Sequence, residues 1–251
     1  MILEYIRPKT LDEALKLLAR SNPFTVPLGG GTVLSRHSDR DCAVVDLQNL
    51  GLDQIESQGN QIRLGSMVTL EHVANSSLVV RDLRRIAQQE TSANLRRVGT
   101  LGGTITVGTG ESRILTCFLA LDAELTIEPG NRTICLGDWL PLRAQSPHSL
   151  IVSISIPANV RLGYESVSRT PSDLPLVGVA IARWPSGRTR VVIGAGKRTP
   201  ALVLDGPEPG GIETAIINAD RNFASQFFSI EYLQDVVKKL ANRIMHEEIQ
   251  E

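Results

Sequence analysis

The sequence predicts an α+β protein. A two-lobe amino-terminal domain, with a small α/β lobe and a larger α+β lobe, precedes a carboxyl-terminal domain of antiparallel sheet with helices. Three observations predict this fold class. Helix and strand patterns alternate early in the chain, consecutive strand patterns follow the segment AQSPHS at 144–149, and helical patterns end the chain. We expect the first domain over residues 1–148, with lobes of about 1–51 and 52–148, and the second over 149–251.

The small lobe begins with a strand and the clearest helix of the sequence, at 10–20. Thr10 and Glu13 fit a capping box there, and apolar residues recur along one face. Short apolar runs predict buried strands at 24–28 and 42–47. A loop containing three consecutive glycines separates these two strands.

The larger lobe is predicted to mix both element types. We expect a strand at 61–65, helices at 69–75, 78–90 and 114–120, and a hairpin of 124–127 with 132–136. The last domain is predicted to hold strands at 150–157, 163–168, 176–184 and 190–194, followed by helices at 211–219 and 229–246. In the final helix an apolar stripe is formed by Ile230, Leu233, Val237, Leu240 and Ile244.

Composition and charge exclude several classes of partner. The net charge is -1 and aromatic residues make up 4 % of the chain, so neither a basic field nor stacking platforms favour nucleic acid. No window approaches the roughly 18 apolar residues of a membrane span. The amino end has no apolar core of signal-peptide length, so we expect a cytoplasmic chain.

Metal sites and nucleophilic catalysis find no support in the sequence. The three cysteines, Cys42, Cys117 and Cys135, are far apart and odd in number, which argues against disulfides and against an iron–sulfur cluster ligated by this chain alone. The four histidines lack metal-site spacing, and no G-x-S-x-G motif is present. We predict no metal site and no catalytic acid, base or nucleophile.

Two glycine loops carry the strongest functional signal, LGGGTVL at 28–34 and GTLGGT at 99–104. Each follows an apolar segment and ends in a threonine, so we expect a strand to lead into bare backbone in both lobes. Consecutive amides without side chains make a nest for phosphate oxygens. The alternative is that both loops are tight turns or close-packing sites. No P-loop motif and no G-x-G-x-x-G before a long helix is present.

The ordered motifs resemble the FAD-binding medium subunit of molybdenum hydroxylases, such as the carbon monoxide dehydrogenase medium subunit and the FAD domain of xanthine dehydrogenase. The matching segments are YIRPKTLDEALKLL at 5–18, LGGGTVL at 28–34, VDL at 45–47, LRRVGTLGGT at 95–104, FLALDA at 118–123, ISIP at 154–157 and the strand pair from Arg169 through Asp173 to Ala180. The resemblance covers nearly the whole chain in order.

This resemblance implies an extended FAD between the two lobes, with both loops on its pyrophosphate and the isoalloxazine towards the carboxyl-terminal domain. The implied partners are a large subunit with a molybdenum cofactor and a small subunit with two [2Fe–2S] clusters, and the implied acceptor is NAD, a quinone or oxygen. The cofactor-binding candidates are Leu28, Gly29, Gly30, Gly31, Thr32, Val33, Leu34, Gly99, Thr100, Leu101, Gly102, Gly103, Thr104, Thr106, Ser112, Arg113 and Val152.

Several positions depart from the family pattern. Val33 replaces an acidic residue, Thr104 an asparagine, Arg113 a cofactor-contacting aspartate, and Glu165 a lysine near the flavin of the xanthine dehydrogenase branch. Arg113 either pairs with phosphate, marks a decayed site or is a solvated surface residue; Asp173 is expected in a turn. The leading hypothesis is an FAD-binding electron-transfer subunit. The alternatives are a flavin-free structural subunit and, less favoured, a stand-alone flavin oxidase.

Overall fold

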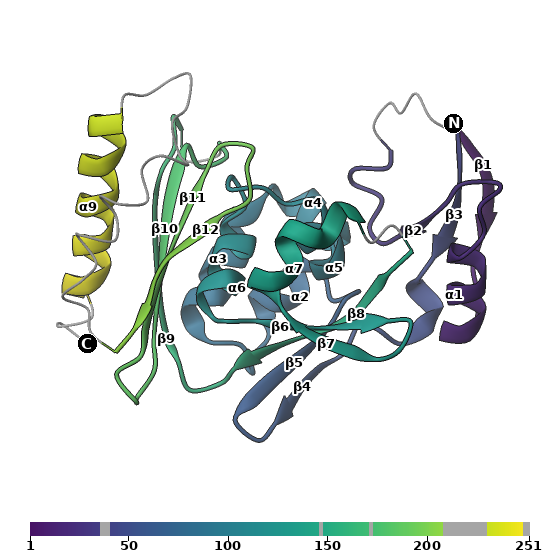
Figure 1. Cartoon of the computed structure of the whole chain (residues 1–251), viewed down its shortest axis with the longest axis horizontal. Coiled ribbons are helices and arrows are strands. Elements are labelled where there is room, and N and C mark those ends of the chain that lie inside the picture. Colours follow the sequence, from purple (N-terminus) through teal and green to yellow (C-terminus); the bar gives the residue numbers. More distant parts are fainter. Residues whose placement is uncertain (36–40, 146–147, 171–172, 208–229, 248–251) are drawn as a thin grey trace.

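The computed structural model describes residues 1–35, 41–145, 148–170, 173–207 and 230–247. Three sheets follow one another along the molecule, with most helices grouped in the middle and α9 (Ile230–Glu247) on the outside of the last sheet (Figure 1). The α+β class predicted from the sequence is confirmed.

The small lobe is a parallel three-stranded sheet with strand order β1-β3-β2. Its strands are β1 (Ile2–Ile6), β2 (Thr25–Leu28) and β3 (Cys42–Asp46), and α1 (Leu11–Leu18) lies between β1 and β2 in the chain. The predicted cap is present, because the Thr10 side chain accepts a hydrogen bond from the Glu13 amide. A 3₁₀ turn, η1 (Gln48–Leu50), leads into the next lobe.

The middle lobe is an antiparallel sheet covered by helices. The strand order is β4-β5-β8-β6-β7, comprising β4 (Ile55–Gln58), β5 (Gln61–Gly65), β6 (Glu124–Glu128), β7 (Arg132–Cys135) and β8 (Leu150–Pro157). The helices are α2 (Leu70–Asn75), α3 (Arg81–Glu90), α4 (Ala93–Val98), α5 (Leu101–Val107), α6 (Arg113–Ala120) and α7 (Leu136–Trp139), followed by the 3₁₀ helix η2 (Leu140–Gln145).

Strand β8 joins this middle sheet, although the sequence analysis assigned residues 150–157 to the carboxyl-terminal domain. It pairs antiparallel with β5 on one side, from Gln61↔Pro157 to Gly65↔Ser153, and with β6 on the other. Period-two patterning shows that a segment is a strand but does not show which sheet it joins. The pairing therefore places these residues with the lobe that precedes them.

The last sheet has strand order β12-β11-β10-β9 and is antiparallel throughout. Its strands are β9 (Arg161–Val167), β10 (Val177–Arg183), β11 (Thr189–Ala195) and β12 (Ala201–Gly206), and β12 was not predicted. The final predicted helix is present as α9. The helix expected at 211–219 lies outside the described residues.

Both faces of the last sheet are buried, so it is joined to the middle lobe by a continuous core. One face contributes Leu162, Tyr164, Ala180, Ala182 and Val192 to the large core that contains α3 and α6. The other face packs on Leu233, Val237, Leu240 and Ile244 of α9. A third core joins the small lobe to β8.

Candidate functional site

The first glycine loop leaves β2 and lies directly against the second. A Cβ atom at Gly30 would stand 1.6 Å from the Val98 carbonyl oxygen, and one at Gly29 would stand 2.7 Å from Thr100 Oγ1. Gly31 adopts a φ of +70°, which favours glycine. The three glycines therefore allow close contact between the loops and a left-handed turn, so close packing accounts for part of this motif.

The second loop follows a helix and begins another, which corrects the expected strand-to-loop arrangement. It lies between α4 and α5, where Thr100 is the N-cap and its Oγ1 accepts a hydrogen bond from the Gly103 amide at 3.2 Å. The backbone amides of Leu101 and Gly102 donate hydrogen bonds to the carbonyls of Val68 and Ser66, respectively. Gly102 is required by packing, because a Cβ there would lie 2.9 Å from Ser66 Cβ.

Gly103 has an ordinary helical backbone, and outside its own helix only a side chain would crowd a Cβ there. It is exposed and lies in the first turn of α5, and outside its own helix backbone a Cβ there would meet only Thr100 Oγ1, at 3.1 Å. Glycine in a helix costs about 0.5–1 kcal/mol relative to alanine. The bare backbone at Gly103 therefore leaves the main chain open to a close approach from outside.

The first loop carries backbone amides that this chain does not use. Within the described part of the chain, no acceptor is found for the backbone amides of Gly29, Gly30, Gly31 and Thr32. The hydroxyl groups of Thr104 and Thr106 instead donate to the helix carbonyls of Thr100 and Gly102. The surface between the lobes thus offers backbone donors rather than threonine hydroxyls.

Asp46 anchors the carboxyl edge of the small sheet beside the first loop. It is paired in register with Leu28 and accepts hydrogen bonds from Tyr5, Arg7 and the Gln48 amide. Burial acts to raise the pKa of Asp46, but these hydrogen bonds outweigh it and hold the pKa below its usual range. The sequence analysis noted this residue only within the VDL strand.

Ser112 and Arg113 belong to a separate buried group at the start of α6. Ser112 Oγ donates to Glu90 Oε1 at 2.6 Å, and the Ile114 amide donates to Glu90 Oε2 at 3.0 Å. Burial raises the pKa of the Glu90 carboxyl despite these hydrogen bonds. Glu90 was missed because a glutamate ending a helical pattern is normally solvated.

Arg113 is not a solvated surface residue. Only 5 % of it is exposed, and its Nη2 donates to the Asp173 carbonyl oxygen at 2.9 Å. Asp173 lies in a turn as predicted, because its amide donates a hydrogen bond to the Thr170 carbonyl, three residues earlier. Arg113 therefore ties the start of α6 to the segment between β9 and β10.

The remaining candidates lie at different depths. Leu101 and Val152 are buried in the cores, whereas Val33 is 41 % exposed and Leu28, Thr32 and Leu34 are half-buried. Gly99 is buried, and a Cβ there would stand 2.9 Å from the Leu95 carbonyl. The structure therefore brings residues 28–32 and 98–103 together and leaves Ser112, Arg113 and Val152 in other surroundings.

Comparison with known proteins identifies the family of this chain. Residues 1–159 match the family described as the FAD binding domain in molybdopterin dehydrogenase. The chain belongs to this family. The YgfM protein of Escherichia coli K12 is 28 % identical over 228 residues, which cover 87 % of this chain and 86 % of that protein. The carbon monoxide dehydrogenase medium chain of Afipia carboxidovorans is 28 % identical over 202 residues, covering 73 % and 69 %.

A solved structure shows the same fold as this FAD-binding subunit. Quinoline 2-oxidoreductase from Pseudomonas putida 86 matches with a TM-score of 0.82 and 20 % identity, covering 98 % of this chain and 96 % of that chain. Family membership makes the chain an FAD-binding oxidoreductase subunit of the molybdenum hydroxylase family. Among the helices in the described ranges, none is long and apolar enough to cross a membrane.

The glycine loops of the FAD-binding subunit fit a pyrophosphate. Gly29 and Gly103 both lie against Thr100, and the amides of Gly29–Thr32 have no acceptor among the described residues. Bare main chain of this kind suits an anion that approaches it closely. Glu165, by contrast, pairs in register with Val179, whose side chain belongs to the core shared with α9. Because cross-strand partners share a face, Glu165 lies on the α9 side, away from the middle lobe.

Proposed function

We propose that this chain is the electron-transfer subunit of a molybdenum hydroxylase-type dehydrogenase, passing electrons from iron–sulfur clusters of a partner through FAD to an external acceptor. The observation that carries the proposal is Gly103. It is an exposed glycine with an ordinary helical backbone, and a Cβ there would press only on Thr100 Oγ1, at 3.1 Å. A cofactor phosphate lying on the main chain accounts for its absent side chain.

The residues of the chain bind and orient the cofactor and carry out no proton chemistry. FAD supplies both one-electron and two-electron transfer when bound. The amides of residues 29–32 would donate to the pyrophosphate of a bound FAD, and Thr100, whose Oγ1 accepts from the Gly103 amide, lies against Gly29 of the first loop. The carboxyl-terminal sheet, beginning after β8, would face the isoalloxazine. We therefore assign no catalytic acid or base.

The family and the medium chain among the relatives support the proposed partners. We propose a large subunit with a molybdenum cofactor, a small subunit with [2Fe–2S] clusters, and NAD or a quinone as acceptor, in the cytoplasm. The test is to purify the chain from its native host under gentle conditions. The proposal expects visible flavin absorbance, FAD identified by mass and two copurifying chains that contain molybdenum and iron.

A flavin-free structural subunit is the second candidate, and Arg113 favours it. This buried cation stands where the family motif has an acidic cofactor contact, and its guanidinium is held by the Asp173 carbonyl instead. A folded chain that copurifies with both partners yet stays colourless with excess FAD would establish this second candidate.

A further inference from the structure

Helix α6 is attached to the last sheet at both of its ends. Before its first turn, the Gly110 amide donates to the Arg198 carbonyl, and a Cβ at Gly110 would stand 2.5 Å from the Ala195 amide nitrogen. Arg113 adds the hydrogen bond to the Asp173 carbonyl. All eight residues of α6 are buried, so the packed helix connects this attachment to a second one at its other end.

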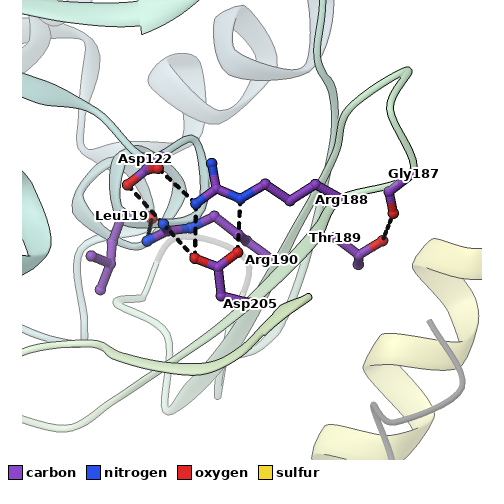
Figure 2. A network of polar contacts seen from close by, with 7 residues as sticks. All are labelled: Leu119, Asp122, Gly187, Arg188, Thr189, Arg190 and Asp205. Atoms are coloured by element: carbon purple, nitrogen blue, oxygen red, sulfur yellow. Dashed lines mark hydrogen bonds and ion pairs between the residues drawn. The ribbon is translucent and has the colours of Figure 1, made fainter. Parts of the chain in front are cut away.

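The attachment after the last turn of α6 is a network of four charged residues (Figure 2). Arg190 Nη1 lies 2.7 Å from Asp122 Oδ1 and 3.0 Å from Asp205 Oδ2, and its Nη2 donates to the Leu119 carbonyl at 3.2 Å. Arg188 bridges the same two carboxylates at 2.8 Å each. The Arg190 side chain is only 6 % exposed, so solvent and salt screen its pairs weakly.

Asp122 has a backbone conformation that most residues disfavour. Asp122 ends α6 with a φ of 55°, at a position where glycine is the usual residue. Residues other than glycine carry a conformational cost there, although aspartate and asparagine tolerate it best. The aspartate therefore offsets that cost with its two ion pairs across the interface.

Apolar packing is interrupted beside this network. A pocket of ≈ 370 Å³ lies next to it, lined on one side by Leu119, Leu140 and Pro141 and on the other by Thr199, Pro200 and Leu202. Side chains do not fill the space between α6–α7 and the β11–β12 connection. At this end of α6, the charged network holds the two surfaces in register.

We infer that Asp122 and Arg190 are a positioning pair, which fixes the last sheet on α6 and thereby sets how closely that sheet covers the bound flavin. The inference rests on the proposed function, because it presumes a flavin beside that sheet. Asp122 acts through the strands that carry Arg190 and Asp205 and touches no cofactor itself. Loss of its charge leaves Arg188 and Arg190 sharing one carboxylate.

The test uses the full chain with bound FAD and compares Asp122→Asn with wild type. Asparagine keeps the left-handed backbone and removes one charge. Arg188→Gln is the second variant, because that side chain is 39 % exposed and its loss leaves the Arg190 pairs intact. Asp235→Asn is the matched control, since it breaks an exposed pair with Lys239 on α9 and changes the charge equally.

The readouts are FAD affinity and quenching of flavin fluorescence by iodide, with chloride keeping the ionic strength constant. We expect all three variants to bind FAD as wild type does. The quenching constant of Asp122→Asn should rise severalfold, while those of Arg188→Gln, which keeps the Asp122–Arg190 pair, and of the control stay unchanged. Unchanged quenching in folded, FAD-loaded Asp122→Asn, or an equal rise in Arg188→Gln, would overturn the positioning role of this pair and leave the proposed function intact. A wild-type chain that binds no FAD would instead reject the proposed function, and the inference with it.

Discussion

At the scale of single residues, the glycines of the two loops serve different purposes. Gly29 and Gly30 permit loop-to-loop contact, Gly31 permits a positive φ, and Gly103 leaves backbone bare. A sequence pattern shows only that a side chain is absent. It does not show whether this chain or a ligand occupies the space.

The Gly30→Ala variant should separate the two lobes. The added methyl group would overlap the Val98 carbonyl oxygen at 1.6 Å, so the loops must move apart. We expect a loss of about 3 kcal/mol or more in the free energy of unfolding, measured in urea. Gly206→Ala is the control, because nothing lies within 4 Å of a Cβ there. Equal stability of both variants would refute the close contact.

At the scale of elements, Glu90 connects α3 to the start of α6. In the wild type, the Ser112 hydroxyl and the Ile114 amide donate to the two carboxylate oxygens of Glu90. Glu90→Gln keeps the shape of the side chain but leaves only one acceptor oxygen for these two donors. We expect a loss of about 1–3 kcal/mol in the free energy of unfolding. The exposed Glu231→Gln serves as the control, and a loss no larger than the control's would contradict the role of Glu90 in capping α6.

The pH dependence of this variant has a definite sign. Because the pKa of Glu90 is raised in the folded state, folding favours its protonated form. The contribution of Glu90 to the free energy of unfolding is greatest at acid pH and is lost as pH rises through the raised pKa of its carboxyl. The stability advantage of wild type over Glu90→Gln should therefore narrow with rising pH, as measured by urea unfolding across that range. An advantage that widens would contradict the raised pKa.

Most elements could be predicted from the sequence because their patterns are local. The helix starting after Thr10, the hairpin at 124–135 and the last helix all carry strong periodicity or capping signals. Helix α5, of sequence LGGTITV, was missed because glycine and β-branched residues have low helix propensity. Tertiary contacts hold it instead, because the backbone N–H groups of its first two residues donate hydrogen bonds to the carbonyls of Val68 and Ser66.

The candidate site was predictable only in part. The glycine loops were found because consecutive glycines are conspicuous and match a family motif in order. Glu90, Asp46 and the Asp122 network were not assigned roles, because each acts through partners distant in sequence, such as Arg190 for Asp122. Patterns within one segment carry no information about such pairs.

At the scale of the whole molecule, the family match ends at residue 159 but the core does not. Leu162, Tyr164 and Val192 of the last sheet pack in the same core as α3 and α6. A fragment of residues 1–159 would expose the buried faces of both helices to water. We expect it to lack a cooperative thermal transition and to aggregate. A fragment that unfolds cooperatively would show that the amino-terminal domain is independently stable.

The central claim is that bare backbone at the two loops binds FAD, and Gly103→Ala tests it most directly. Alanine is the better helix former by about 1 kcal/mol, which acts against the pressure of its Cβ on Thr100 Oγ1 at 3.1 Å, so we expect the variant to keep a folded α5. The measurement is FAD bound per chain, by absorbance titration of wild type, Gly103→Ala and Gly206→Ala. The account predicts one FAD per wild-type and Gly206→Ala chain, and affinity at least about tenfold weaker in a stably folded Gly103→Ala, or roughly 1.4 kcal/mol. Equal affinity in all three would contradict it.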